Sequence, residues 1–356
     1  MSAPPPVIWF NQGLSQLYDA VRLIRAEAAG SVVVCASHRE RDAPVMGVAD
    51  RCFEEPPRAT PEETYVQWAL QVCAREQVRL FVPSRHAGAI AGARAQFERL
   101  GVYVQVAQAE ALAGALEYKD VLYAEVAGQM DLPAYRVVSS LAQFDEAYAS
   151  LRNAHPRVCV KPTRGLFGAG FRILDESIDP LDAILRVDGA LAALAAYRDA
   201  LEHTRRTYTL MVMEYLDGPE RSVDCLAFQG KLVAAVARLK QGRQQSLETS
   251  GAAIEGARWL VERYRLDGIV NIQFRDTRGT PHLLEINARM AGGMLYSCAA
   301  INLPYWSAML ALGLAQPHEV PVPRNGLRVA PISGALVIPS EPPAERASGL
   351  AADRSA

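Results

Sequence analysis

Short apolar runs alternate with amphipathic segments over residues 1–115. Four runs have the length and apolar character of buried strands: residues 7–10, 31–36, 79–83 and 102–106. In residues 14–28 the apolar positions recur at helical spacing instead, and Gly30 marks the end of that helix. Because strands that alternate with helices form parallel sheets covered on both faces, we predict an α/β domain in this part of the chain.

Signals for helix starts place two more helices in this domain. Thr60 and Glu63 have the spacing of a capping box, and Pro61 suits the first position of a helix. The pattern predicts a helix that begins at this point and ends near Gln77. A further helix is predicted near residues 86–99.

From residue 116 the pattern changes to one typical of antiparallel sheets. Apolar runs linked by short polar turns predict five strands, at 157–162, 170–174, 209–216, 222–229 and 231–240. An alanine-rich helix is expected at about 180–201, a hairpin at 267–287 and a helix near 296–314. We therefore predict an α+β domain over residues 116–339. Residues 340–356 contain no aromatic or β-branched side chain, which predicts a disordered tail.

Composition and charge exclude several classes of function. The 37 basic and 39 acidic side chains among 356 residues leave a formal net charge of −2, so no overall basic field favours nucleic acid. The chain has no apolar run of 18 residues, and its first residues lack the pattern of a signal peptide. Six scattered cysteines without a C-x-x-C pair are typical of free thiols in a reducing compartment. We expect a cytoplasmic protein that binds neither nucleic acid nor membrane.

A glycine-bearing loop follows the strand at 157–162. Lys161 ends that strand, and the loop contains three glycines, Gly165, Gly168 and Gly170. Glycines let backbone N–H groups approach a phosphate closely, beside the ammonium of the lysine. Taken alone, this segment is explained better by a flexible hairpin with a surface lysine.

The strand at 209–216 ends in polar groups that suit a nucleoside. The carboxylate of Glu214 and the backbone of Tyr215 and Leu216 can recognise an adenine edge, and Glu220 can bind ribose hydroxyls. A solvated strand end with ordinary surface acids is the alternative. This motif therefore indicates a nucleotide site only in combination with the neighbouring motifs.

The hairpin at 267–287 predicts a metal site. Glu285 and Asn287 alternate along a strand and share one face, while Leu284 and Ile286 face the other side. If a three-residue loop at 278–280 connects the strands, Gln273 pairs with Glu285 and adds a third oxygen to that face. Carboxylate and amide oxygens suit magnesium, which completes its shell with phosphates and water.

Further candidate residues could bind an anion, either through a positive charge or through exposed backbone N–H groups. Arg289 follows the metal motif and could hold a phosphoryl group or an oxyanion, and Gly292 and Gly293 precede a predicted helix that would favour an anion. Arg238 and Lys240 end a strand and either face the γ-phosphate or an acidic substrate, or belong to a solvated strand end. Arg85 follows a parallel strand, at the edge where open α/β sheets bind ligands.

The order of these motifs resembles that of the ATP-grasp superfamily, in particular its carbamoyl-phosphate-synthetase-like branch. Lys119 precedes V-K-P and the glycine loop, and then come M-E-Y-L-D-G-P-E-R-S-V-D, Gln273 and E-I-N-A-R. The resemblance covers residues 1–335, and residues 31–56 are similar to ATP-grasp proteins associated with tellurite-resistance gene clusters. It implies a pre-ATP-grasp domain over residues 1–115 and a small lid subdomain at about 130–212.

The resemblance also implies roles for the motifs. ATP would be contacted by Lys119, Lys161, the loop at 165–170, Glu214, Tyr215, Leu216 and Glu220. One or two Mg²⁺ ions, with Mn²⁺ as an alternative, would be bound by Gln273, Glu285 and Asn287. Arg289 would stabilise a phosphorylated intermediate.

The function implied is that of an ATP-dependent carboxylate–amine ligase, which forms an amide or peptide bond through an acyl phosphate and releases ADP and phosphate. Its substrates would be small and amino-acid-like, and a homodimer is expected by analogy alone. Two alternatives stay open. The protein could phosphorylate bicarbonate or carbamate, or it could be a regulatory or scaffold protein that binds ATP without turnover.

Overall fold

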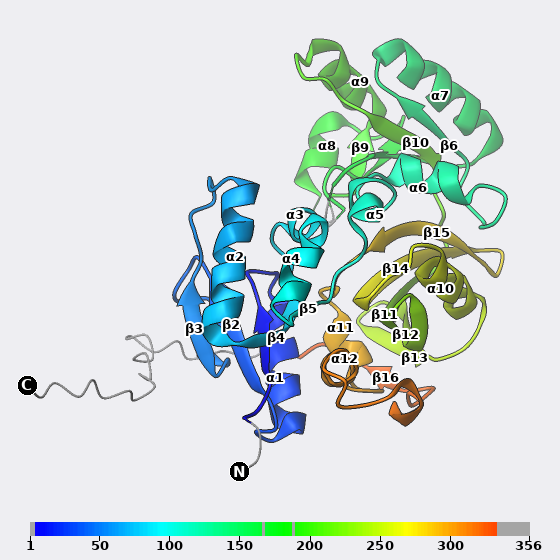
Figure 1. The fold of residues 1–356 in the computed structure, drawn as a ribbon. Helices are drawn as coiled ribbons and strands as arrows, with labels where there is room; N and C mark the ends of the chain where they lie inside the picture. Colours follow the sequence, from blue (N-terminus) through cyan, green and yellow to red (C-terminus); the bar gives the residue numbers. More distant parts are fainter. Residues whose placement is uncertain (1–3, 166–167, 187–188, 333–356) are drawn as a thin grey trace, which may run out of the picture.

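The computed structural model describes residues 4–165, 168–186 and 189–332, so the tail predicted at 340–356 lies outside the described residues. Within them the chain forms three β-sheets (Figure 1). A parallel sheet comes first, a second sheet forms a separate lobe, and a sheet of antiparallel pairs comes last. This mixed α/β and α+β architecture confirms the predicted fold class.

The first sheet is parallel, with the strand order β3-β2-β1-β4-β5. Its strands are β1 Val7–Phe10, β2 Val33–His38, β3 Arg51–Glu54, β4 Val78–Val82 and β5 Tyr103–Val104. The sequence pattern did not predict β3, because this edge strand has no fully buried residue and carries charged ends. The other four strands agree with the predicted positions.

Helices cover both faces of the parallel sheet. On one face lies α1 (Gln16–Ala28), and on the other lie α2 (Glu62–Glu76), α3 (Ala87–Gly92) and α4 (Arg94–Arg99). The capping box expected at Thr60 is not formed, because Pro61 is the N-cap and no side chain caps the helix. The end near Gln77 is confirmed, since this residue adopts the left-handed conformation that closes the helix.

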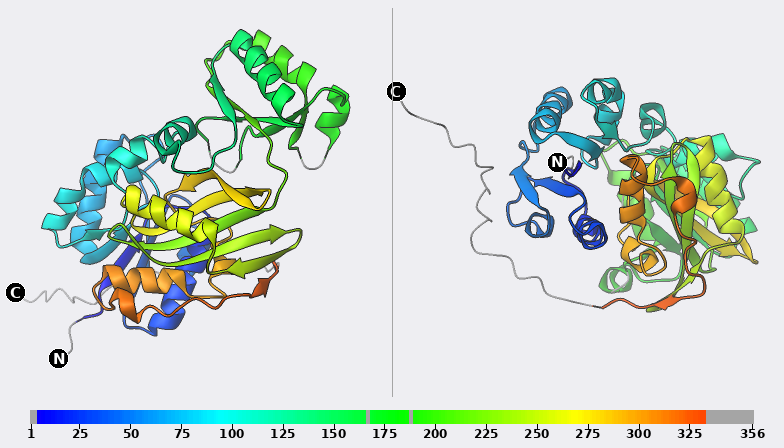
Figure 2. Two further views of the ribbon diagram at one scale, coloured as in Figure 1. Left: turned by 90° about the vertical axis from the view of Figure 1, so that its right-hand side faces the viewer. Right: turned by 60° about the horizontal axis from the view of Figure 1, so that its bottom comes forward.

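The second sheet has the order β6-β10-β7-β8-β9 and stands out as a lobe that we call the lid (Figure 2). Its strands are β6 Tyr135–Val138, β7 Val158–Pro162, β8 Arg172–Asp175, β9 Leu191–Ala193 and β10 Leu210–Glu214, and its helices are α7 Leu141–Ala154, α8 Pro180–Leu185 and α9 Leu194–His203. The single helix expected at 180–201 is therefore wrong. Two helices flank β9 instead, because β9 gains a parallel partner in β8.

The third sheet has the order β15-β14-β11-β12-β13-β16 and pairs antiparallel throughout. Its strands are β11 Glu220–Phe228, β12 Lys231–Gln241, β13 Gln244–Glu248, β14 Gly268–Thr277, β15 Thr280–Asn287 and β16 Arg328–Val329. Its helical neighbours are α6 Lys119–Val126, α10 Ala252–Arg263, α11 Met294–Ser297 and α12 Leu303–Ala311. The helix expected near 296–314 is thus divided in two.

One hydrophobic core joins the lid to this third sheet. It combines buried side chains of α6, α10, β11 and β14 with Cys159 of β7 and Met211 and Met213 of β10. Short elements complete the chain: α5 Ala109–Ala113 and the 3₁₀ turns Pro44–Gly47 and Pro317–Glu319. Among the helices of the described residues, none is long and apolar enough to span a membrane.

Candidate functional site

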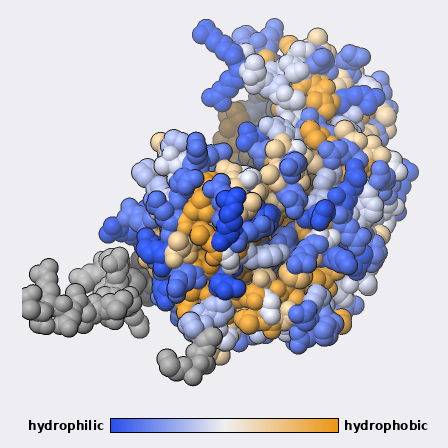
Figure 3. Space-filling view, in the orientation of Figure 1, coloured by the Kyte–Doolittle hydropathy of each residue, from blue (hydrophilic) through white to orange (hydrophobic). Residues whose placement is uncertain are grey.

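A cavity of about 210 Å³, here called the first cavity, lies between the lid and the third sheet. The space-filling view shows this face of the molecule hollowed between the lid and the rest of the molecule (Figure 3). Apolar side chains line one part of the cavity: Pro133, Cys159, Ala169, Phe171, Met213 and Leu284. Charged or polar groups line the rest: Lys119, Lys161, Glu214, Glu220, Gln273, Arg275 and Glu285. A flat apolar ring and a polar chain can therefore be bound together.

Two lysines converge on the polar part of the first cavity. Lys119, at the start of α6, has its Nζ 3.0 Å from the carbonyl oxygen of Gly165 and 3.4 Å from Oε2 of Glu285. Lys161, at the end of β7, donates to the carbonyl oxygen of Leu284 at 3.3 Å and lies 5.2 Å from the ring centre of Tyr123. Burial lowers the pKa of Lys161 to about 8, against the opposing effect of Glu285.

The β14–β15 hairpin positions these contacts through a bulge. The connection is the two-residue turn Arg278–Gly279, both with positive φ, and not the expected three-residue loop. Gln273 still pairs with Glu285, because the register shifts next to Gln273. The extra residue, Leu284, lines the cavity and accepts from Lys161, which corrects the expectation that it faces the opposite side.

The predicted metal donors lie where two cavities meet. Gln273 lines the first cavity, Asn287 lines a second cavity, and Glu285 lines both. Nδ2 of Asn287 donates to Oε1 of Glu285 at 3.1 Å, which leaves the amide oxygen available. One carboxylate and two amide oxygens on neighbouring strands suit a magnesium ion that keeps waters and binds phosphate. Among the described residues, no group of three or more His, Cys, Asp or Glu side chains could bind a metal, in keeping with a donor set rich in amides.

At the other end of the first cavity, several predicted nucleotide-binding side chains already have partners. The carboxylate of Glu214 accepts from the backbone N–H of Ala134 at 3.2 Å and lies 2.5 Å from Nδ1 of His155. Glu220 forms ion pairs with Lys240 and with Arg275, the latter at 3.4 Å. The backbone of this segment has partners as well, since the N–H of Tyr215 donates to the carbonyl oxygen of Arg157 at 3.0 Å and the carbonyl oxygen of Leu216 accepts from Arg275 at 3.3 Å.

Tyr215 and the glycine loop border this end. The Tyr215 ring lies between two guanidinium groups, with Arg157 at 4.4 Å and Arg275 at 5.7 Å from its centre. In the loop, Gly168 has φ +65° and lines the cavity. Gly170 has φ +79°, and a Cβ there would lie 2.7 Å from Cγ of Pro162, so a side chain at this position would be both strained and crowded.

Arg238 forms a buried ion pair away from both cavities. Its Nε donates to Oδ2 of Asp224 at 2.8 Å, and the side chains are 3% and 0% exposed. Asn271 donates to the same carboxylate at 2.8 Å, and Ser297 does so at 2.6 Å. The structure therefore corrects the expectation that Arg238 contacts a phosphoryl group, because its guanidinium is already bound inside the protein.

One of the two predicted glycines makes room for this ion pair. A Cβ on Gly293 would lie 2.3 Å from Nη1 of Arg238, so glycine leaves room for the guanidinium. Gly292 and Gly293 line neither cavity, and the helix α11 that follows them has four residues. The expected anion site at this helix start is therefore not supported.

Arg289 lines the second cavity, whose volume is about 320 Å³. Burial lowers the pKa of its guanidinium, which Glu285 opposes. The cavity reaches from the end of β15 to the parallel sheet, where it touches Pro83 and Ser84, and it shares Lys119, Gly165 and Glu285 with the first cavity.

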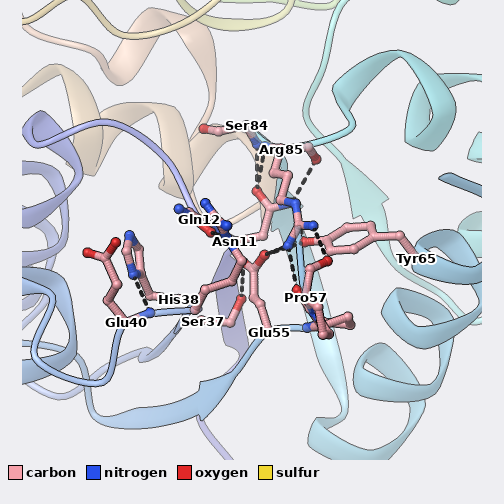
Figure 4. Close-up of polar contacts among 12 residues, drawn as sticks. Asn11, Gln12, Ser37, His38, Glu40, Glu55, Pro57, Tyr65, Ser84 and Arg85 are labelled. Atoms are coloured by element: carbon pink, nitrogen blue, oxygen red, sulfur yellow. Dashed lines mark hydrogen bonds and ion pairs between the residues drawn. The ribbon is translucent and has the colours of Figure 1, made fainter. Parts of the chain in front are cut away.

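Arg85, a predicted substrate contact, belongs to a polar network at the edge of the parallel sheet (Figure 4). Its Nη1 lies 3.0 Å from Oε2 of Glu55, whose side chain is 0% exposed, and its guanidinium donates to two backbone carbonyls, of Pro56 and Pro57. Ser37 and Tyr65 donate to the same carboxylate at 2.9 and 3.0 Å. The guanidinium is thus engaged within the protein.

Sequence reasoning missed Arg275, Tyr123 and the Asp224–Asn271 contact. Arg275 shares the alternation of Gln273 along β14, a signal that could have placed it on the cavity face. Tyr123 donates to the carbonyl oxygen of Leu283 at 2.8 Å, a contact between residues 160 positions apart that no local pattern shows.

Part of the chain is similar in sequence to known proteins. Residues 206–335 match the family model described as ATP-grasp in the biosynthetic pathway with Ter operon. The chain is also similar to carnosine synthase 1 of Mus musculus, at 31% identity over 124 residues, and of Homo sapiens, at 29% over 124 residues. Each match covers 30% of this chain and only 15% of the length of the curated relative.

Solved structures share the fold over nearly the whole chain. The ADP complex of an N5-carboxyaminoimidazole ribonucleotide synthetase has a TM-score of 0.63 at 15% identity, covering 91% of this chain and 80% of that one. The L-amino acid ligase of Bacillus licheniformis has a TM-score of 0.57 at 15% identity, with coverages of 90% and 78%. The biotin carboxylase domain of the Hydrogenobacter thermophilus 2-oxoglutarate carboxylase, with MgADP and bicarbonate, has a TM-score of 0.55 at 15% identity, with coverages of 88% and 70%.

The three-sheet fold and the family match agree with each other. The family model covers most of the third sheet, from which the predicted metal donors project. Residues 206–335 therefore match an ATP-grasp family associated with the Ter operon, and the chain shares its fold with the solved structures named above.

Proposed function

We propose that this protein is an ATP-dependent carboxylate–amine ligase that works through an acyl phosphate. One observation carries the proposal: Lys119 and Glu285 lie 3.4 Å apart where the first cavity meets the second cavity. Cations that bind phosphates and a donor set that suits magnesium thus lie between the places for ATP and for an acceptor. The names of two similar proteins, an L-amino acid ligase and carnosine synthase, support amide formation.

The first step transfers a phosphoryl group. A carboxylate oxygen in the second cavity attacks the γ-phosphorus of ATP, the bond to the β–γ bridging oxygen breaks, and ADP leaves. Lys119 and Lys161 offset the charge on the phosphates, and Arg289 holds the carboxylate in line. Magnesium bound by Gln273, Glu285 and Asn287 would supply further neutralisation of the phosphates.

The second step forms the amide. The amine nitrogen attacks the acyl carbon, the carbon–oxygen bond to phosphate breaks, and the nitrogen loses a proton. Closure of the lid over the first cavity would exclude the water that hydrolyses an acyl phosphate. No side chain needs to act as a covalent nucleophile, in keeping with buried cysteines such as Cys159, whose pKa burial raises to about 12.

Nucleotide product analysis tests the proposal. With Mg²⁺ and ATP, a pool of small carboxylates and amino acids should stimulate release of ADP and phosphate by the wild-type protein. Glu285→Gln should lower this rate at least 100-fold, because it removes the one carboxylate of the donor set. The exposed Glu202→Gln on α9 is the matched control and should keep the wild-type rate.

Other results of the nucleotide product analysis would favour a different function. Release of AMP and pyrophosphate would exclude the acyl-phosphate route. Stimulation by bicarbonate alone would favour the carboxylating alternative, a reaction class to which one similar structure's bound bicarbonate also points. Tight ATP binding without any turnover would support the regulatory alternative.

A further inference from the structure

The second cavity has a wall that is apolar and comes from outside the third sheet. Ala87 of α3, Leu112 of α5 and Leu116 of the following turn line it, and all three are partly buried apolar residues packed against hydrophobic cores. Buried Ala115 and Leu122 continue the same wall. Such a wall offers no partner to a polar group, so it favours a ligand with an apolar body.

The second cavity also has polar lining residues. Asn287 and Arg289, at and beyond the end of β15, lie there beside Glu285. A guanidinium binds a carboxylate through two parallel hydrogen bonds, and the second cavity adjoins the first cavity through the shared Glu285. A ligand whose carboxylate points to Arg289 and whose body lies against Leu112 and Leu116 would present that carboxylate to the nucleotide.

Two further cations near the second cavity form ion pairs with acids. Arg164, which lines it, forms an ion pair with Glu117, which also lines it. Arg85, next to Ser84 of the lining, is bound to the buried Glu55 (Figure 4). In these pairs an acid already neutralises the positive charge of the arginine. A second carboxylate or a phosphate group on the ligand would therefore find less positive charge to bind it.

The volume of the second cavity indicates the size of the carboxylate that fits it. About 320 Å³ lies at the lower end of the range for small-molecule sites. Bicarbonate would leave the apolar wall unoccupied, whereas a body of about four to nine carbon atoms would cover it.

We propose that the second cavity selects a monocarboxylate with an apolar body of amino-acid size, such as an aliphatic or aromatic amino acid. This assignment rests on the proposed function, and it names the class of acid that the protein activates. Bicarbonate, polycarboxylates and phosphorylated acids are disfavoured by the same wall and the same engaged cations.

Variants of the wall test the assignment. Leu116→Trp should fill the cavity and lower kcat/KM for L-leucine or isovalerate at least tenfold, with ADP affinity within twofold of wild type. Leu116→Ala should enlarge it and shift the ratio of kcat/KM values at least fivefold from L-leucine toward L-phenylalanine. Leu100→Trp, on an exposed side chain (46%) at the end of α4, is the control and should change neither quantity.

Binding measurements keep the test independent of turnover. Calorimetric titration of isovalerate into the wild-type protein with Mg²⁺ and a non-hydrolysable ATP analogue should show binding that Leu116→Trp weakens at least tenfold. Tighter binding of bicarbonate, citrate or 3-phosphoglycerate than of isovalerate would overturn the assignment, as would unchanged profiles in both Leu116 variants. The absence of ADP release with every acid would instead contradict the proposed function, while the titration would still decide what the cavity binds.

Discussion

Burial changes the acid–base behaviour of Lys161, a side chain that we place against the nucleotide phosphates. Its ammonium lies among Tyr123, the carbonyl of Leu284 and the Glu285 carboxylate. Loss of water raises the cost of the charged form and lowers the pKa from 10.5 to about 8. The unfolded chain therefore binds more protons than the folded one between these values, so the free energy of unfolding rises with pH across that window.

The affinity for nucleotide should instead fall as the pH rises. Above pH 8 the free protein loses the Lys161 charge that attracts phosphates, so the affinity for MgADP should fall about tenfold between pH 7 and pH 9. Lys161→Met should bind more weakly at pH 7 and lose this dependence, whereas Lys231→Met, on an exposed residue, should keep it. Titration calorimetry at several pH values measures both, and a flat wild-type profile would contradict the assignment.

Asn271 is a positioning residue for the predicted metal donors. Its side chain donates to Asp224 and Ser222 at 2.8 and 2.9 Å, and its oxygen accepts from Gln273 at 3.4 Å. Asn271→Ala leaves a buried carboxylate with one partner fewer and frees the Gln273 amide, so we expect about 1–3 kcal/mol less stability. The Mg²⁺ concentration for half-maximal activity should also rise several-fold.

The metal requirement separates positioning from mere destabilisation. Asn325→Ala removes a comparable amide at the surface, where it accepts from the backbone of Thr249, and should leave the Mg²⁺ requirement unchanged. Denaturant unfolding and Mg²⁺-dependent ADP release provide the two readouts. A loss of stability in Asn271→Ala without a change in Mg²⁺ requirement would assign this residue to the core alone.

Among the elements, the β14–β15 hairpin shows what local sequence can and cannot predict. Alternation of Glu285 and Asn287 correctly predicted a strand, and Gln273 pairs with Glu285 although the three-residue loop on which that pairing was conditional is absent. The bulge at Leu284 was not predictable, because it depends on the Arg278–Gly279 turn and on contacts to Lys161 and Tyr123 from distant elements. For the same reason the lid helix expected at 180–201 was wrong, since the pairing of β8 with β9 decides that segment.

The turn should therefore be sensitive to a single methyl group. Gly279 has φ +83° with open space around it, so Gly279→Ala costs backbone strain alone, about 1 kcal/mol. Gly92→Ala, at the end of α3 and also in open space, lacks a positive φ and should be neutral or slightly stabilising. Chemical denaturation compares the two, and equal effects would show that the turn conformation does not limit stability.

At the scale of the whole molecule, the first cavity is shared between two sheets. Lys161, Glu214 and the glycine loop belong to the lid, whereas Gln273, Arg275 and Glu285 belong to the third sheet. The order of the motifs along the chain predicts that these residues share one site. It does not predict which side chains they contact in the structure. His155 and its partner Glu214 lie 59 positions apart in the chain, and only the folded lid brings them together.

A ligand that contacts both sheets should stabilise the whole molecule. At a concentration 100 times its Kd, MgADP would add about 2.7 kcal/mol, which corresponds to a rise in Tm of about 4 °C for a chain of this size. EDTA should remove most of this rise in Tm. Without the metal ion, no cation would lie between the phosphates and Glu285 with its neighbours. A shift that survives both EDTA and Glu285→Gln would mean that the nucleotide binds without the predicted metal donors, and that the charge balance at this boundary rests on Lys119 and Lys161 alone.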